Sequence, residues 1–317
     1  MLFPLAHHLT SAMEHRIRIR WRRTRWAVPA WTFGFVLIAS AELQGQQAHL
    51  AIRPARPLPG AIVRLSLTDA GASDAIVAVS GTMAGEPLHF AGAGRAWRAI
   101  GAVPVDSGNA IVAHVTATRA SGRTDTLSAS VTPPPLPPPK EQLAVAQRFG
   151  KPMDAATAAR VERENRRAMA VGRQSQQEPP KWTAPFRKPR TSEISSGFGT
   201  GRTFNGQVAS RHLGVDFRGA TGAPIRAANA GVVALVDNFF LGGNVVYIDH
   251  GGGLTTGYLH LSRTLVHVGD EVARGQVIGL VGATGRVTGP HLHWTARYGA
   301  LTVNPLDLLT LTPLPAP

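Results

Sequence analysis

Hydrophobic and polar residues alternate with a period of two at the start of the chain's first β-like region. Val63, Leu65 and Leu67 are separated by single polar residues, which is the pattern of a strand with one buried face. Short apolar runs follow it, and turns rich in Gly, Asp or Ser separate them; these runs cover residues 76–79, 111–115 and 127–131. Their size and spacing predict a β-sandwich-like domain over residues 46–132.

A second series of short apolar runs fills the carboxy-terminal part of the chain, residues 181–317. Glycines separate these runs at close intervals, and none of them has a long helical periodicity. The predicted strands cover residues 225–228, 231–236, 244–249, 254–260, 276–281 and 291–297. The pattern predicts a second β-rich domain, so the fold class is mainly β.

Residues 133–180 have a different character and are predicted to be a linker that contains one helix. The linker begins with PPPLPPP, whose six prolines in seven residues impose an extended polyproline conformation. Residues 154–169 are rich in Ala, Arg and Glu and contain neither Gly nor Pro, which predicts a helix. Its apolar stripe, Val161 and Met169, is thin, and a polar segment that we interpret as a hinge follows it.

Two interpretations of this helix remain open at this stage. The helix is either a passive spacer or an autoinhibitory element that rests on the neighbouring domain and swings away. The second interpretation predicts that a fragment beginning near Pro180 is more active than the full chain.

The amino-terminal residues 1–45 have the pattern of an export signal. A cationic run at residues 16–26 precedes an uncharged, mostly apolar run at residues 27–41, which ends in Ala-Ser-Ala. About 20 residues are needed to span a membrane, and this run is shorter. We interpret the segment as a signal peptide, with an uncleaved signal anchor, which would attach the protein to the membrane, as the alternative. Both predict export to the periplasm or cell envelope.

Composition narrows the chemistry that the chain can perform. The absence of cysteine excludes disulfides, thiolate zinc sites, iron–sulfur clusters and cysteine nucleophiles, so a metal must be held by His, Asp or Glu. The net charge of +14 suits an anionic partner, without identifying it.

The histidines of the second domain form two short motifs. His212 and Asp216 have the spacing H-x-x-x-D, and His291 and His293 have the spacing H-x-H. Alternate residues of a strand point to the same face, so His291 and His293 can both address one zinc site. Catalytic zinc takes three protein ligands and leaves a position for water, and a nearby histidine that is not a ligand can exchange protons.

The second domain resembles the LytM/lysostaphin-type zinc metalloendopeptidases, which cleave the peptides of bacterial peptidoglycan. The match covers about residues 182–310, and its motifs occur in the family's order. They are residues 195–199, SSGFG; 212–216, HLGVD; 222–227, GAPIRA; 243–251, GNVVYIDHG; 258–262, YLHLS; 268–270, VGD; 275–279, GQVIG; 282–285, GATG; and 289–293, GPHLH.

This resemblance implies a fold, a cofactor and a site. The fold is β-rich, with a groove across an antiparallel sheet, and the cofactor is Zn²⁺. His212, Asp216 and His293 correspond to the zinc ligands, whereas His260 and His291 correspond to the catalytic histidines. In some relatives an Asn upstream of the site blocks the zinc, and Asn205 is the remote candidate for that role here.

The resulting functional hypothesis is a zinc-dependent endopeptidase that cuts peptidoglycan stem or cross-link peptides during cell-wall remodelling. The alternative is a non-catalytic LytM-type domain that binds or activates another cell-wall hydrolase. A lipoyl-type carrier is disfavoured because the only lysines after residue 180 are Lys181 and Lys188, both outside the carrier-like hairpin at residues 268–279. No nucleic-acid partner is expected, because the basic residues show no aromatic interleaving and the chain is predicted to be exported. The oligomeric state is left open.

Overall fold

The structure is a computed structural model that describes residues 48–70, 73–138 and 140–313. The predicted export signal, residues 1–45, lies outside the described residues. Every described residue belongs to the same compact unit of the chain, Gln44–Pro317. Neither helix in these ranges is long and apolar enough to cross a membrane.

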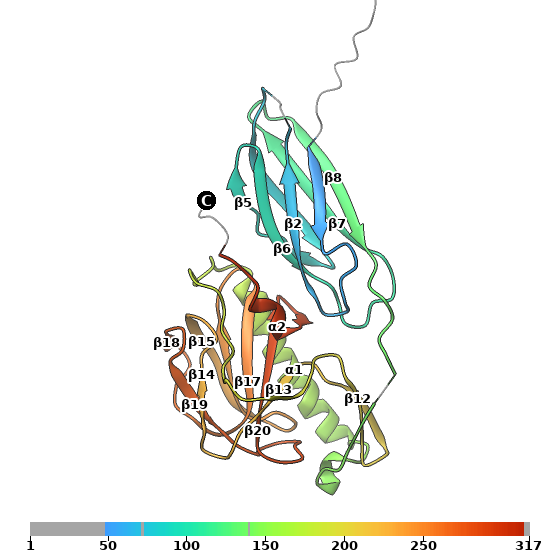
Figure 1. Cartoon of the computed structure of the whole chain (residues 1–317), viewed down its shortest axis with the longest axis vertical. Coiled ribbons are helices and arrows are strands. Elements are labelled where there is room, and N and C mark those ends of the chain that lie inside the picture. Colours follow the sequence, from blue (N-terminus) through green and yellow to red (C-terminus); the bar gives the residue numbers. More distant parts are fainter. Residues whose placement is uncertain (1–47, 71–72, 139, 314–317) are drawn as a thin grey trace, which may run out of the picture. The chain divides into compact units, whose positions relative to one another are not determined.

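The amino-terminal part of this unit consists of two four-stranded antiparallel sheets, with strand orders β1-β2-β6-β5 and β4-β3-β7-β8 (Figure 1). The strands are β1 His49–Arg53, β2 Ile62–Thr68, β3 Ile76–Met83, β4 Glu86–Pro87, β5 Ala91–Ala93, β6 Ala96–Ala102, β7 Ile111–Arg119 and β8 Thr124–Val131. Val63, Leu65 and Leu67 are all buried, as their alternation predicts. The same period of two appears in β7, where every second side chain is buried.

The carboxy-terminal part is built on a ten-stranded sheet whose main order is β10-β13-β20-β17-β16-β15-β18, with β14, β19 and β21 paired beside this path. Its strands are β10 Ile194–Ser196, β13 Val215–Arg218, β14 Pro224–Arg226, β15 Gly231–Phe239, β16 Gly243–Asp249, β17 Leu254–Thr264, β18 Glu271–Val272, β19 Val277–Val281, β20 His291–Tyr298 and β21 Leu301–Val303. The short helix α2 Pro305–Leu308 follows β21. The predicted mainly β fold class and the antiparallel sheet are confirmed.

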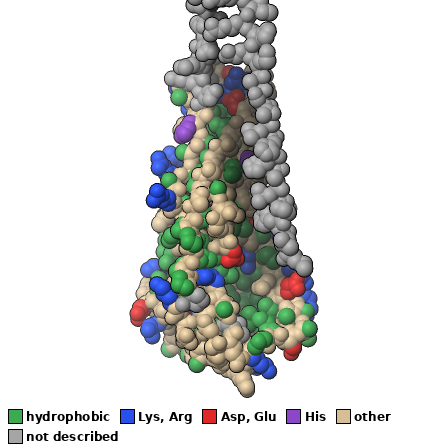
Figure 2. Space-filling view, turned by 90° about the vertical axis from the view of Figure 1, so that its right-hand side faces the viewer, with side chains coloured by type: hydrophobic (Ala, Val, Ile, Leu, Met, Phe, Trp, Pro, Cys, Tyr) green, Lys and Arg blue, Asp and Glu red, His purple; other side chains and the backbone are tan. Residues whose placement is uncertain are grey.

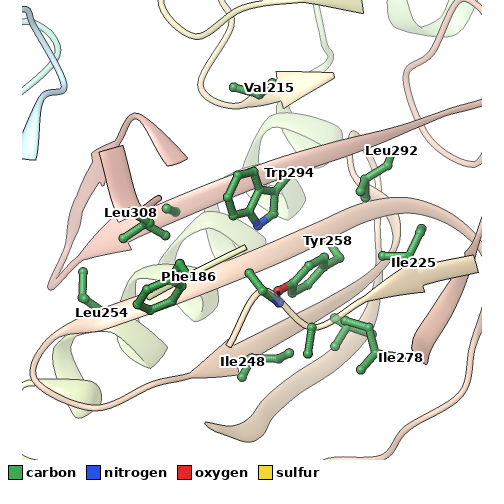
Figure 3. Close-up of a cluster of buried hydrophobic side chains, with 14 of the residues drawn as sticks. Phe186, Val215, Ile225, Ile248, Leu254, Tyr258, Ile278, Leu292, Trp294 and Leu308 are labelled. Carbon is green, nitrogen blue, oxygen red and sulfur yellow. Dashed lines mark hydrogen bonds between the residues drawn. The ribbon is translucent and has the colours of Figure 1, made fainter. Parts of the chain in front are cut away.

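Two large aromatic side chains lie at the centre of the core of this sheet (Figure 3). Trp294 of β20 and Tyr258 of β17 are fully buried and face each other in register across the two strands. The Tyr258 hydroxyl accepts a hydrogen bond from the backbone N–H of Ala228 at 2.7 Å, so its polar atom is satisfied inside the core. This packing joins β17 and β20, the strands that carry His260, His291 and His293.

Helix α1 Ala155–Ser175 is longer than predicted and packs closely on the sheet. The Asp154 side chain caps it by accepting a hydrogen bond from Thr157 N–H at 2.7 Å. Its buried face carries small side chains, and Ala168 and Val171 share a hydrophobic cluster with residues of β15 and β16. The predicted stripe of Val161 and Met169 is only half-buried. The stripe was misplaced because small residues, which add little to hydrophobic periodicity, make the closest contacts.

The segment after α1, which we interpreted as a flexible hinge, is bonded to the sheet. Residues 173–175 belong to the helix. The carbonyls of Ser175 and Glu178 accept hydrogen bonds from Gly253 and Gly252 N–H at 3.0 and 2.7 Å, and Lys181 N–H donates to the His250 carbonyl at 2.7 Å. The segment that the autoinhibitory interpretation takes as a hinge is therefore hydrogen-bonded to the sheet in the structure, and the activity difference that this interpretation predicts stays a prediction.

The predicted linker also contributes a strand to the neighbourhood of the site. Strand β9 Glu141–Leu143 pairs in parallel with β11 Gly201–Phe204, which in turn pairs with β12 Val208–Arg211. A single turn of 3-10 helix, Gln147–Phe149, precedes α1. Residues 133–180 thus supply one strand and one helix that contact the carboxy-terminal part.

Candidate metal centre

The pairing of β13 with β20 positions two of the three residues that we assigned to the metal. In this antiparallel register Asp216 lies directly opposite His293, which brings the two side chains close together on one face. His212 lies just before β13, and Gly214 separates it from that strand. A Cβ atom at position 214 would lie only 2.5 Å from the His293 ring, so glycine is required here for close approach.

His212, Asp216 and His293 bring one atom each to a common point. His212 Nε2 lies 3.0 Å from Asp216 Oδ1, His293 Nδ1 lies 2.8 Å from the same oxygen, and the two ring nitrogens are 2.9 Å apart. Within the described residues they form the one cluster of three or more His, Cys, Asp or Glu side chains with metal-binding spacing. Sequence spacing alone could not reveal this, because the two motifs are 75 residues apart.

The hydrogen bonding of His212 shows that this cluster suits a cation. His212 Nδ1 lies 2.7 Å from the Gly197 carbonyl oxygen and donates to it, which leaves a lone pair on Nε2. That lone pair faces a carboxylate oxygen and a second ring nitrogen. Such electron-rich atoms repel one another unless they share a proton or a metal ion, and two imidazole nitrogens with one carboxylate form a typical ligand set for catalytic zinc. The residues present therefore fit a zinc ion.

The charge states of the cluster also favour metal binding. Burial opposes ionisation of Asp216, but when its Oδ1 shares a proton with the His212 and His293 nitrogens these contacts outweigh burial and hold the pKa of this carboxyl well below its usual range. Burial lowers the pKa of His293 to about 4. A carboxylate and a neutral imidazole are the forms that coordinate metals.

Arg202 holds the second oxygen of Asp216. Its Nη2 donates to Asp216 Oδ2 at 2.7 Å, and its Nε donates to Glu141 Oε2 at 2.7 Å. The Ser196 hydroxyl donates to the other oxygen of Glu141 at 2.7 Å. Asp216 is thereby oriented with Oδ1 toward the two histidines. Sequence reasoning missed Arg202 and Glu141, because their contact depends on the β9–β11 pairing across about 60 residues.

His260 and His291 lie beside the cluster, and a hydrogen bond from Nδ1 to a backbone carbonyl orients each ring. His260 Nδ1 donates to the Thr284 carbonyl at 2.8 Å, and His291 Nδ1 donates to the Gly289 carbonyl at 2.9 Å, so each ring keeps Nε2 free. The two ring centroids are 4.9 Å apart. His291 Nε2 lies 3.6 Å from Asp216 Oδ1.

The backbone and the electrostatics of His260 distinguish it from an ordinary strand residue. Its φ of +66° lies in the left-handed region, which a non-glycine residue occupies at an energetic cost and which is frequent at functional sites. Burial, followed by repulsion from His291 and His293, lowers the pKa of His260 well below its usual value. His260 is therefore neutral near pH 7 and can accept a proton.

All five predicted site residues line a single groove with a volume of about 630 Å³. The other candidates lie elsewhere. His250 is fully buried and bonded to the Ala230 carbonyl and the Thr256 hydroxyl, whereas His267 is exposed. Asn205 is not part of the metal cluster, because its side-chain amide exchanges two hydrogen bonds with the backbone of Val145.

Comparison with known families decides what kind of domain carries this site. Residues 210–305 match the model of Peptidase family M23. We call residues 210–305 the M23 domain, after the family model that they match. The resemblance stated from the sequence motifs is thus confirmed, and all five predicted site residues lie within the M23 domain. Arg202, Glu141 and α1 lie outside it.

Curated relatives match only the carboxy-terminal part of the chain. A stretch of 114 residues, 35% of the chain, is 44% identical to the peptidoglycan DD-endopeptidase ShyC of Vibrio cholerae and covers 26% of that protein. A stretch of 83 residues, 26% of the chain, is 52% identical to ShyA, a peptidoglycan DD-endopeptidase of the same organism, and covers 19% of it. The matched part of the chain therefore spans about a quarter or less of these two relatives.

A solved structure extends the likeness beyond the M23 domain. A Pseudomonas aeruginosa protein assigned to peptidase M23 is 27% identical, with a TM-score of 0.59 over 80% of this chain and 95% of that one. Because the M23 match covers residues 210–305 alone, the upstream part of the fold is also shared.

Proposed function

We propose that this protein is a zinc-dependent endopeptidase that hydrolyses peptide bonds in the stem or cross-link peptides of peptidoglycan. The observation that carries the proposal is the convergence of His212, Asp216 and His293 beside His260 and His291 in one groove. The M23 match and the two relatives named as peptidoglycan DD-endopeptidases support the same chemistry.

The zinc would be held by His212, Asp216 and His293, and Arg202 would keep Asp216 in its ligating orientation. When bound, zinc lowers the pKa of its water to about 7 and polarises a carbonyl group. The carboxylate of Asp216 and the neutral rings supply the ligand atoms. His212 Nε2 carries no proton, because the ring proton is on Nδ1, so this nitrogen can bind zinc directly.

His260 and His291 would move the protons of the reaction. Each presents a free Nε2 to the groove, because its Nδ1 proton is bound to a backbone carbonyl. A neutral imidazole at this place can take a proton from the attacking water, and the imidazolium that forms can stabilise the oxyanion or protonate the leaving amine. The two rings share these tasks in our proposal.

The proposed place of action is the periplasm or cell envelope, where peptidoglycan lies. Figure 2 shows one face of the molecule. Outside the part that grey atoms cover, Lys and Arg side chains are scattered over it among hydrophobic and neutral side chains. The net charge of +14 suits residence on an anionic wall polymer.

Digestion of purified peptidoglycan tests the proposal. Zinc-loaded protein should release peptides whose masses show one new amino and one new carboxyl terminus per cut, and His291→Ala protein should release them at least about 100-fold more slowly. If the wild type releases no product but binds the polymer, and stimulates a second wall hydrolase, the non-catalytic alternative replaces the proposal.

A further inference from the structure

The ionised side chains that line the groove do not balance one another. Four arginines and two acids line it, and the two acids, Glu141 and Asp216, are both bonded to Arg202. Arg218 pairs with Glu193 outside the lining, at 3.0 Å. Arg211 donates to the carbonyls of Pro137 and Gly199. Arg286, the fourth arginine of the lining, differs from the other three. Among the described residues no carboxylate lies within 4.0 Å of its guanidinium.

Arg286 is nevertheless held in place. Its backbone N–H donates to the Leu241 carbonyl at 2.9 Å, and the turn before it is tied down by the Thr284 hydroxyl, which donates to the Leu261 carbonyl at 2.9 Å. The guanidinium carbon lies 3.9 Å from the centroid of the Phe204 ring, and Phe204 itself is buried. A cation on an aromatic face is attracted to it, and this stacking leaves the N–H groups at the guanidinium edge free.

The turn that presents Arg286 is the same turn that orients His260. The Thr284 carbonyl accepts the His260 Nδ1 proton, and Arg286 follows two residues later. The β20 histidine His291 follows Arg286 by five residues, and all three side chains line the groove. The guanidinium therefore lies in the same groove as the two histidines, on the turn that orients one of them.

The state of Arg286 is unfavourable without a partner. Burial, together with repulsion from Arg202, lowers the pKa of this guanidinium to about 10, so it keeps its charge near pH 7 at a cost in free energy. An anion that enters the groove removes that cost. A carboxylate matches the planar guanidinium with two parallel hydrogen bonds, which are stronger than bonds between neutral groups.

We infer that Arg286, supported by the Phe204 ring, forms a subsite for a carboxylate of the peptide that is cut. The inference rests on the proposed function and makes it more specific: the substrate class is an acidic peptide with a free carboxylate near the scissile bond. A neutral peptide of the same length would leave the guanidinium unpaired and would be cut more slowly.

A comparison of two substrates with two proteins tests the inference. The substrates are cross-linked stem-peptide dimers released from peptidoglycan and the same dimers with their carboxylates converted to carboxamides. The proteins are the wild type and Arg286→Met, which keeps an unbranched side chain on Phe204 but removes the charge. On the carboxylate dimers we expect kcat/KM to fall about 10- to 100-fold in Arg286→Met, as the loss of a charge-assisted hydrogen bond implies. On the amidated dimers the two proteins should be equal.

Two further variants control for general damage. Arg218→Met removes another groove arginine that is exposed and already paired, and it should change kcat/KM by less than about threefold, as expected for a surface ion pair. Arg286→Lys keeps the charge without the planar fork and should fall between the wild type and Arg286→Met. Zinc content and thermal midpoint should match the wild type in all three. An equal loss on both substrates would overturn the inference, because Arg286 would then act only on the fold.

A binding measurement separates this inference from the proposed function. Carboxylate and carboxamide dimers are titrated into His291→Ala protein and into His291→Ala/Arg286→Met protein. Suppose that the wild type cuts neither substrate. If His291→Ala protein then binds the carboxylate dimers at least tenfold more tightly than the carboxamide dimers, and His291→Ala/Arg286→Met protein does not, the proposed function fails and the subsite stands. Cleavage of both dimers at equal rates by the wild type contradicts the subsite alone.

Discussion

At the scale of single residues, backbone carbonyls decide which nitrogen each histidine of the groove presents. Gly197, Thr284 and Gly289 each accept an Nδ1 proton, from His212, His260 and His291 respectively. Each of these rings therefore directs an unprotonated Nε2 away from its carbonyl partner, which is what a metal ligand or a proton acceptor needs. Three hydrogen bonds from histidine side chains to backbone carbonyls therefore prepare the groove for chemistry.

Metal content tests the ligand assignment. Purified wild-type protein should contain about one equivalent of zinc, whereas Asp216→Ala and His293→Ala should lose most of it, since each removes one of three ligand atoms. The measurement is elemental analysis after exhaustive dialysis. His267→Ala, which removes an exposed histidine, is the matched control and should retain its zinc. Full zinc retention in a His212→Ala, Asp216→Ala double variant contradicts the assignment.

Activity at constant zinc content tests the roles of His260 and His291. Replacement of either residue by Ala should reduce the turnover of peptidoglycan peptides by about 10²- to 10⁴-fold, the usual contribution of a general acid or base. Zinc content should stay near the wild-type value. A loss of metal in His291→Ala would show that this histidine is a ligand instead, which its 3.6 Å distance to Asp216 Oδ1 makes a meaningful check.

Arg202 provides a residue-scale test that does not depend on turnover. Arg202→Met leaves Asp216 Oδ2 without its hydrogen bond at 2.7 Å, so the carboxylate is less well oriented. Partners behind a metal ligand typically contribute about 10- to 100-fold to metal affinity, and we expect a loss of that size in competition with a chelator. Arg218→Met is the control. Arg218 lies next to Phe217 in β13, and this variant should bind zinc like the wild type. Unchanged affinity in Arg202→Met would make the Arg202–Asp216 contact incidental.

At the scale of elements, two segments outside the M23 domain complete the site's surroundings. Strand β9 supplies Glu141, which accepts a hydrogen bond from Arg202 Nε while Arg202 Nη2 donates to Asp216. Helix α1 covers hydrophobic side chains of the sheet, including Leu235, Phe239 and Tyr247. Its removal in a fragment that begins near Pro180 would expose this apolar surface, so we now expect such a fragment to be less stable than the full chain.

The docking of α1 depends on a glycine. A Cβ atom at Gly172 would lie 1.8 Å from the Gly299 carbonyl oxygen, which is closer than any real contact. Gly172→Ala should therefore lower the free energy of unfolding by about 1–3 kcal/mol, as overpacking does, although Ala favours helix formation over Gly. Urea unfolding measures the change. Gln174→Ala, at an exposed position of the same turn, should be neutral or slightly stabilising, and a stabilised Gly172→Ala would show that the helix does not pack as described.

At the scale of the whole molecule, the stability of the fold depends on the protonation of a buried histidine that is not part of the metal cluster. His250 is fully buried between the Ala230 carbonyl, the Thr256 hydroxyl and the ring of Phe186. Burial lowers its pKa from the usual value of 6.5 to about 4. The folded protein therefore keeps His250 neutral over a pH range in which the unfolded chain protonates it.

This difference predicts a loss of stability in mild acid. As pH falls from about 6.5 to 4, only the unfolded state gains the proton on His250, so the free energy of unfolding should decrease, by about 3 kcal/mol in total. Above pH 7 the residue contributes no pH dependence. The difference in stability between the wild type and His250→Gln, measured by urea unfolding from pH 4 to 8, should shrink as pH falls. A constant difference across that range would assign the acid sensitivity to other groups.

Local chemistry in the sequence is sufficient to predict much of this protein. The period of two at Val63, Leu65 and Leu67 predicted a strand with one buried face, and these side chains are buried, because alternation is a property of the extended backbone itself. The motifs around His212 and His291 indicated the family, since each motif is short and self-contained. The sequence also predicted five site residues that line one groove in the structure, although the roles of these residues stay a prediction.

Contacts between distant segments were decided only by the tertiary structure. Glu141, Arg202 and Asp216 form one hydrogen-bonded chain, yet no spacing in the sequence relates them, because the β9–β11 and β13–β20 pairings bring them together. The docking face of α1 escaped prediction because close helix packing requires small residues such as Gly172, which carry no hydrophobic signal. Arg286 looked like any other arginine of a basic chain until the fold placed it in the groove without a carboxylate partner among the described residues. Hydrophobic periodicity in the sequence predicts which side chains are buried, whereas the packing of the folded chain decides which residues they contact.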